Sequence, residues 1–176
     1  MHPQHTTQHD HHESARSERQ EPSGAASEPQ ASLRRHDGQK RILVDAANVA
    51  FTNRNRPNDK GCVENIRAMR RALVELGYDP IFIADASLRF EVDEPEELNQ
   101  LEQAGKILQA PAGTQADYFL LADAKRENLS IVSNDTFRDR KDEFPNAFKR
   151  RVPFMIVDGR VIVDRERLAQ PVAARQ

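Results

Sequence analysis

At residues 40–48 the sequence reads Lys40-Arg41-Ile42-Leu43-Val44-Asp45-Ala46-Ala47-Asn48, and this segment sets the architecture that we expect. Ile42, Leu43 and Val44 form a short continuous apolar run, which is typical of a strand buried on both faces of a sheet. The run ends in an acid, Asp45, and the amide Asn48 follows three residues later. The sequence therefore predicts a buried parallel strand with polar side chains at its carboxyl end.

Strand and helix signals alternate after this segment. Buried strands are predicted at residues 80–84, 106–109 and 130–133, and a hairpin or strand pair at 152–157 and 161–163 around an Asp158-Gly159 turn. Helices are predicted at residues 62–76, 93–105 and 114–127, and a long loop at residues 46–61. In the first helix the apolar residues Ile66, Met69, Leu73 and Leu76 share one face. This order predicts an α/β fold, a three-layer α/β/α sandwich with a mainly parallel central sheet.

Composition divides the chain of 176 residues into tails and one predicted domain. Residues 1–39 hold all six histidines and, after Met1, a single large aliphatic residue, Leu33. Such a segment cannot bury enough apolar surface to offset its ordering entropy, so we expect a disordered tail, with a transition-metal site at residues 9–12 as the alternative. The predicted domain spans residues 40–167, and residues 168–176 form a short C-terminal tail.

Charge and composition exclude several classes of protein. The chain has 26 Lys and Arg against 28 Asp and Glu, so it is not a uniformly basic coat protein. Cys62 is the only cysteine and no histidine follows His36, which excludes disulfide frameworks, Ser-His or Cys-His nucleophile pairs and His- or Cys-based zinc sites from the predicted domain. No apolar run is long enough for a membrane span and no secretory signal is recognisable, so we expect a cytoplasmic protein without membrane contact.

Acids recur where the predicted strands end. Asp45 and Asp135 follow the first and fourth strands, Asp85 follows the second, and Asp139 comes four residues after Asp135. Asp117 lies in the helix before the fourth strand. Because ligands of open parallel sheets bind beyond the carboxyl ends of the strands, we expect these acids to converge at one edge.

Converging carboxylates repel one another, so at neutral pH they either gain a raised pKa or hold a cation. Oxygen donors without His or Cys suit Mg²⁺ or Mn²⁺. Such ions bind phosphate oxygens and activate water for attack on a phosphodiester. The acids therefore favour phosphoryl chemistry.

Each of these acids also has a structural interpretation, as the cap of a turn or helix, and it stays open here. Asp117 lies three residues after Thr114 and could complete a capping box, and Asp139 could be a solvated charge. The amide of Asn48 could orient a phosphate or the attacking water, or it could serve a turn.

Two segments resemble a known family. Residues Val44-Asp45-Ala46-Ala47-Asn48-Val49-Ala50 and Ile131-Val132-Ser133-Asn134-Asp135-Thr136-Phe137-Arg138-Asp139 resemble the NYN group of PIN-like nucleases, and within it the Regnase/MCPIP-like ribonuclease branch. The similarity covers roughly residues 41–163. It implies a PIN-like, Rossmann-like sandwich and a metal-dependent endoribonuclease that hydrolyses phosphodiester bonds of single-stranded or structured RNA.

The resemblance also implies roles for single residues. Asp45, Asp117, Asp135 and Asp139 would bind Mg²⁺ or Mn²⁺, and Asn48 would belong to the same catalytic site. The chain departs from the family in three respects: Ala46-Ala47 replaces a Gly-Ser pair, Ala116 stands where the family often has a second acid before Asp117, and no Cys-rich zinc-finger module adjoins the domain. One fewer carboxylate implies a single metal or weaker metal affinity.

Binding of RNA requires positive charge around the acidic centre. The candidates for RNA contact are Arg54, Arg56, Arg138, Arg140 and Lys141, with a solvated surface as the alternative. Aromatic residues near the predicted site are few, namely Phe51, Tyr118 and Phe137, so we expect little base-specific recognition by stacking.

Other functions stay open at this point. The main alternative is a PIN-like module that binds RNA or a protein but cuts weakly or not at all. A second is another Asp-based phosphoryl enzyme, although phosphatases with a nucleophilic Asp carry a second Asp two residues on, where this chain has Ala47. The lack of a Gly-rich first turn disfavours a dinucleotide oxidoreductase. DNA as substrate and a homodimer are also left open.

Overall fold

The computed structural model describes residues 39–53 and 59–175. The predicted N-terminal tail and the arginines Arg54 and Arg56 therefore lie outside the described residues. None of the described helices is long and apolar enough to cross a membrane.

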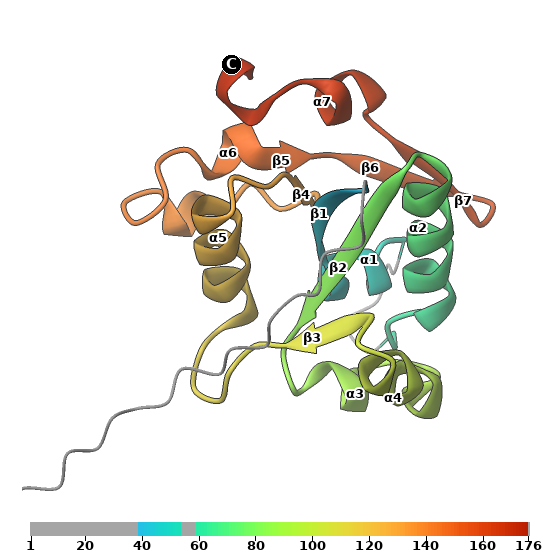
Figure 1. Ribbon diagram of the computed structural model, residues 1–176. Coiled ribbons are helices and arrows are strands. Elements are labelled where there is room, and N and C mark those ends of the chain that lie inside the picture. The colour runs from blue at the N-terminus through green and yellow to red at the C-terminus, as the bar shows by residue number, and fades with distance from the viewer. Residues whose placement is uncertain (1–38, 54–58, 176) are drawn as a thin grey trace, which may run out of the picture. The chain divides into compact units, whose positions relative to one another are not determined.

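A five-stranded sheet forms the centre of the domain, with the strand order β3-β2-β1-β4-β5 (Figure 1). Its strands are β1 (Lys40–Asp45), β2 (Tyr78–Ala84), β3 (Ile107–Gln109), β4 (Ile131–Val132) and β5 (Arg151–Val152). All four pairings between neighbouring strands are parallel. The predicted α/β class with a parallel central sheet is confirmed.

The central strand β1 explains why its sequence is a continuous apolar run. Ile42, Leu43 and Val44 are completely buried. Side chains alternate between the two faces of a sheet, so Ile42 and Val44 face one layer and Leu43 faces the other. Parallel sheets covered by helices on both faces require apolar residues at every position of such a strand.

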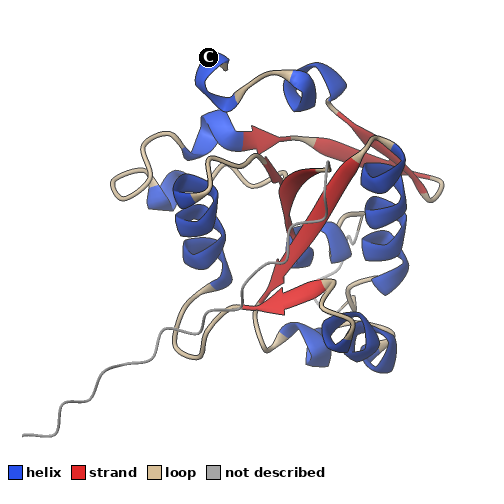
Figure 2. Ribbon diagram, in the orientation of Figure 1, coloured by secondary structure: helices blue, strands red, loops and turns tan. Residues whose placement is uncertain are grey.

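Helices cover the two faces of the sheet (Figures 1 and 2). They are α1 (Ala46–Ala50), α2 (Val63–Glu75), α3 (Leu88–Glu91), α4 (Pro95–Gln103), α5 (Ala116–Arg126), α6 (Ala147–Arg150) and α7 (Arg165–Ala169), with 3₁₀ helices η1 (Arg138–Arg140) and η2 (Val172–Ala174). The chain runs from β1 outward to β3 and then returns past β1 to β4. Because crossovers between parallel strands are right-handed, this return places α5 on the face opposite to α2.

The larger core lies between the sheet and α2. Ile66, Met69 and Leu73 of α2 are buried in the same apolar cluster as Ile42 and Val44 of β1. The helical face predicted from the sequence is therefore confirmed.

The C-terminal strands differ from their prediction. We predicted one strand over residues 152–157, which is wrong because Pro153 divides it. Val152 belongs to β5 of the central sheet, while β6 (Phe154–Val157) and β7 (Arg160–Val163) form a separate antiparallel pair. Proline has no backbone N–H to donate and restricts the residue before it, so a ladder ends readily there.

The segment after β1 also differs from its prediction. Residues 46–61 were predicted as a loop, but Ala46–Ala50 form the short helix α1 directly after β1. Asp45 caps this helix by accepting a hydrogen bond from the backbone N–H of Asn48 at 3.0 Å. A capping side chain at the strand end thus turns the chain into a helix without a loop.

Candidate functional site

The site forms where the order of the strands reverses. The chain leaves β1 toward β2 on one side and comes back to β4 on the other side of β1. In open α/β sheets the crevice at such a switch point, outside the carboxyl ends of the strands, is where ligands bind. Asp45 is the last residue of β1, and Ser133, Asn134 and Asp135 follow β4.

The strand register brings Asp45 beside Ser133. Val44 pairs with Val132, so the next residues along the two strands are neighbours. The hydroxyl of Ser133 donates a hydrogen bond to Oδ2 of Asp45 at 3.0 Å, and both residues are buried. Asp45 and Ser133 lie an even number of residues from Leu43 and Ile131, so they share the sheet face that α5 covers.

Asp45 is the most deeply buried acid of the site, with 8% of its surface exposed. The pKa of Asp45 is raised to about 6, mainly by burial and in smaller part by the negative charges of Asp117 and Asp135, while the hydrogen bonds from Asn48 and Ser133 oppose the shift. The structural interpretation of Asp45 as a helix cap is correct, and the same carboxylate also lies within the field of two other acids.

The loop after β4 fixes the direction of Asp135. The backbone N–H of Asp135 donates to Oγ of Ser133 at 3.0 Å, and Oδ1 of Asp135 accepts from the N–H of Phe137 at 2.9 Å. Phe137 is buried and has a left-handed backbone, with φ of 52°. The amide oxygen of Asn48 accepts from the N–H of Asn134 at 2.8 Å, which ties α1 to this loop.

Asp117 in the first turn of α5 completes the group. The pKa of Asp117 is raised, first by partial burial and then by the charges of Asp135, Asp139 and Asp85, while Arg140 opposes the shift. The structure thus brings Asp45, Asp117 and Asp135 into mutual electrostatic contact. Asp139 is more peripheral, since its side chain is 74% exposed and lies 4.0 Å from the guanidinium of Arg140.

Asp85 has a clear structural task. Its Oδ1 accepts a hydrogen bond from the backbone N–H of Ala116 at 2.9 Å, at the start of α5. The cap expected for Asp85 therefore serves a helix far along the chain rather than the next segment. Its charge still contributes to the raised pKa of Asp117.

Two arginines approach the acids from the side of β5 and η1. The positive charge of Arg140 acts on Asp117, and that of Arg151 acts on Asp135. Arg138, the first basic candidate from the sequence, is exposed and lines a pocket together with Lys141. Arg140 was a candidate for RNA contact from the sequence, and Arg151 belongs to a basic stretch, Lys149-Arg150-Arg151, that the sequence also offered for RNA contact. Ser133 and Asn134 had no predicted role. Ser133 lies two residues before Asp135, directly after the predicted fourth strand, and this spacing is a signal that could have pointed to Ser133 as a partner of the acids.

The negative charge at this site is not balanced by close cations. Within residues 39–53 and 59–175, no Lys or Arg forms an ion pair with Asp45, Asp117 or Asp135. In the same ranges no group of three or more His, Cys, Asp or Glu side chains is arranged to hold a metal ion. Because Mg²⁺ keeps several waters and is often bound through one or two carboxylates, this all-oxygen donor set fits a hydrated ion rather than a closed protein cage.

Comparisons with known proteins bear on the family and the fold of the chain. The Zc3h12a-like ribonuclease NYN domain model matches residues 38–170. A structure of the Arabidopsis thaliana nuclear protein-only RNase P 2 (PRORP2) matches with a TM-score of 0.59 and 19% identity over 77% of this chain and 30% of that chain. A crystal structure of the same plant protein matches with a TM-score of 0.58 and 20% identity over 76% and 30% of the two chains.

These structural matches concern the fold, and this chain spans less than a third of the length of the plant enzyme. No curated protein sequence matches the chain. The family model, in contrast, covers the whole sheet and every acid described above. The chain therefore belongs to the family of Zc3h12a-like ribonuclease NYN domains.

Proposed function

We propose that this chain is a divalent-metal-dependent endoribonuclease whose centre is formed by Asp45, Asp117 and Asp135. One observation carries the proposal: acids from β1, α5 and the loop after β4 meet at the switch point of the sheet, where the charges of Asp117 and Asp135 raise the pKa of Asp45 and the charge of Asp135 raises that of Asp117. None of the three has a Lys or Arg ion-pair partner among the described residues. Negative charge left unbalanced at such a position favours a cation. Membership of a ribonuclease family supports RNA as the substrate.

The acids share one task in this mechanism, and neighbouring groups orient them. Asp45, Asp117 and Asp135 would hold Mg²⁺ or Mn²⁺, partly through water, with Asp139 at the edge of the site. When bound, the ion would supply a water of lowered pKa and neutralise the phosphate that is cut. Ser133 and the N–H of Asn48 keep the Asp45 carboxylate oriented, and the N–H of Phe137 does the same for Asp135.

The basic residues act on the substrate. Arg140 and Arg151 carry the positive charges that reach the acids, so they can stabilise the additional negative charge that a phosphodiester gains during attack by water. The amide oxygen of Asn48 accepts a hydrogen bond from the N–H of Asn134. Asn48 therefore holds the loop after β4 in place rather than accepting a proton. Hydrolysis by direct attack of water needs no covalent enzyme intermediate.

Replacement of Asp135 by Asn tests the proposal. The Asn side chain retains the oxygen that accepts from Phe137 but loses the charge. Asp142→Asn is the matched control, because Asp142 is an exposed acid of the same segment. With labelled single-stranded RNA and Mg²⁺, D135N should cut about 100-fold more slowly or worse, and D142N should cut as the wild type does. Equal rates for D135N and wild type would refute the proposal.

A module that binds RNA but cuts poorly is the second candidate. It is favoured by Ala116 beside Asp117 and by the lack of a three-ligand metal group among the described residues. Titration of Mg²⁺ into the protein with end-labelled RNA separates the two functions, since binding alone leaves the strand length unchanged. A matched DNA strand in the same assay distinguishes a ribonuclease from a nuclease that acts on DNA.

A further inference from the structure

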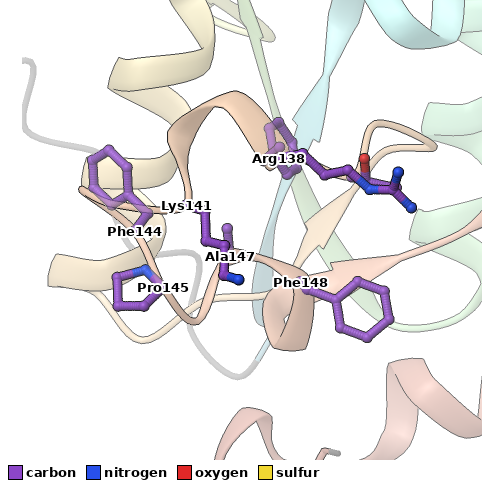
Figure 3. A pocket seen from close by; sticks show the side chains of 8 residues that line it. Arg138, Lys141, Phe144, Pro145, Ala147 and Phe148 are labelled. Atoms are coloured by element: carbon purple, nitrogen blue, oxygen red, sulfur yellow. The ribbon is translucent and has the colours of Figure 1, made fainter.

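We propose that the pocket beside the Asp135 loop is a subsite for an unpaired nucleobase of single-stranded RNA, adjacent to the phosphate that is cut. The inference rests on the proposed function and adds to it the class of RNA and a place for one nucleotide. The pocket has a volume of about 210 Å³. Figure 3 shows Phe144 and Pro145 on one side of it and Arg138 and Phe148 on the other, with Lys141 and Ala147 between them.

The walls of the pocket suit a flat ring. Phe148 is 47% exposed, and the guanidinium groups of Arg151 and Arg167 lie 5.5 and 4.9 Å from the centre of its ring. Phe144 is held by an edge-on contact with Tyr118, with ring centres 5.4 Å apart. Exposed aromatic rings are the platforms on which single-stranded nucleic acids stack their bases. Phe137, one of the three aromatic candidates from the sequence, is buried, and its N–H donates to Asp135.

The charge around the pocket favours a polyanion over an apolar protein segment. Arg138 and Lys141 line the pocket, and an adjoining pocket that shares Phe144, Pro145 and Ala147 adds Lys125 and Arg150. The lining residues of the two pockets thus include four cations and no acid. In a chain that has more acids than bases overall, this segregation marks a surface for phosphates.

The position of the pocket links it to the acids. Its lining begins at Thr136, the residue after Asp135, and includes Phe137, whose N–H holds the Asp135 carboxylate. A base in the pocket would therefore bring its own phosphate close to the acidic group. Pockets for drug-sized ligands measure about 300–1,000 Å³, so this smaller one suits a single base. In a duplex the bases are paired and stacked in the interior of the double helix, so they cannot enter the pocket. The subsite is therefore restricted to single strands, loops and ends.

Binding measurements with two kinds of strand test the subsite. The probes are a labelled oligouridylate and a base-free ribose-phosphate strand of equal length, and dissociation constants are measured by fluorescence anisotropy without divalent metal. Phe148→Leu should weaken binding of the oligouridylate about tenfold and leave binding of the base-free strand unchanged. Phe148→Tyr, which keeps the ring, should bind as the wild type. Phe144→Leu, on the opposite wall, repeats the test with an independent residue.

The phosphate part of the proposal has its own variant. Lys141→Gln should weaken binding of both strands and reduce the slope of log K against log salt by about 0.7. Arg160→Gln, at the exposed first position of β7, is the control and should change neither the dissociation constants nor the salt slope. The subsite is refuted if F148L and F144L bind the oligouridylate as the wild type does, or lose affinity equally for both strands.

The two proposals fail in different ways. If the wild type binds these strands with the expected dependence on Phe148 but never cuts them, the nuclease proposal fails and the base subsite stands. If D135N abolishes cutting while F148L and F144L leave both dissociation constants unchanged, the nuclease stands and the subsite is refuted.

Discussion

The side chain of Asp45 combines two roles that oppose each other. Its hydrogen bonds to Asn48 and Ser133 favour the charged carboxylate, as a helix cap requires. Its burial and its acidic neighbours favour the protonated form, and they prevail, because the pKa of Asp45 is raised to about 6. An acid in this balance gains from a nearby cation more than an exposed acid would.

This balance predicts a dependence of stability on pH. The folded protein binds the Asp45 proton more tightly than the unfolded chain does, since the pKa is about 6 in place of 3.8. The free energy of unfolding should therefore fall as the pH rises through this interval and stay level above it. Without divalent metal, Asp45→Asn should be more stable than the wild type at pH 8, by up to about 3 kcal/mol, and the difference should vanish near pH 4. Thermal unfolding from pH 4 to 8 measures it.

Divalent metal should stabilise the wild type relative to Asp45→Asn. Added Mg²⁺ or Mn²⁺ should raise the melting temperature of the wild type above pH 6, because a ligand that binds only the folded state stabilises it. The same addition should leave the melting temperature of Asp45→Asn nearly unchanged. The controls are Ca²⁺-free buffer and a sample of Asp142→Asn. A metal role for Asp45 would be contradicted if the metal does not change the melting temperature of the wild type, or if it raises that of Asp45→Asn by the same amount.

At the scale of residues the sequence identified the acids but not their partners. Asp45 and Asp135 could be named because they follow apolar strand runs, and Asp117 because it lies at the start of the helix before β4 and matches a family acid. The hydrogen bond from Ser133 to Asp45 depends on the register between β1 and β4, which the sequence does not contain. The hydrogen bond from the N–H of Asp135 to Ser133 is local, but it depends on the conformation of the loop after β4. Phe144 and Phe148 were overlooked because only the folding of the segment after η1 brings them to the Asp135 loop.

Among the elements, α5 is the one whose start controls the site. Asp85, at the end of β2, caps it through Ala116, and Asp117 lies in its first turn. A carboxylate at this end also complements the positive end of the helix dipole. The position of Asp117 relative to β1 therefore depends on a residue from another strand.

Two variants of Asp85 separate capping from catalysis. Asp85→Ala should lower the free energy of unfolding by about 1 kcal/mol, because the N–H of Ala116 loses its acceptor. Asp85→Asn retains an acceptor oxygen and should be nearly as stable as the wild type. Chemical denaturation gives both values. If Asp85→Asn folds normally and cuts RNA at the wild-type rate, Asp85 is a cap only; a large loss of cleavage by this stable variant would make it part of the metal site.

Long elements were predictable and short ones were not. The helix α2 has three turns with one apolar face, and its prediction at residues 62–76 agrees with Val63–Glu75. The helix α1 has five residues, too few to show a period, and depends on the Asp45 cap. The strand β5 has two residues and is recognisable only through its pairing with β4.

At the scale of the whole molecule, the strand order creates the site. Asp45 and Asp135 are far apart in the sequence, and they meet because β4 returns to the side of β1 opposite to β2. The alternation of strands and helices predicted the parallel sheet but not which strands are neighbours. The resemblance to NYN nucleases implied the class of sandwich, and the order of the strands comes from the structure.

The most direct test of the account is crystallographic. Crystals of the chain soaked in Mn²⁺ should show one anomalous peak among Asp45, Asp117 and Asp135, bound directly or through water, and the peak should be absent from crystals of Asp135→Asn. Manganese found only elsewhere, or these three carboxylates each paired with an arginine and no ion between them, would contradict the metal centre and with it the proposed nuclease.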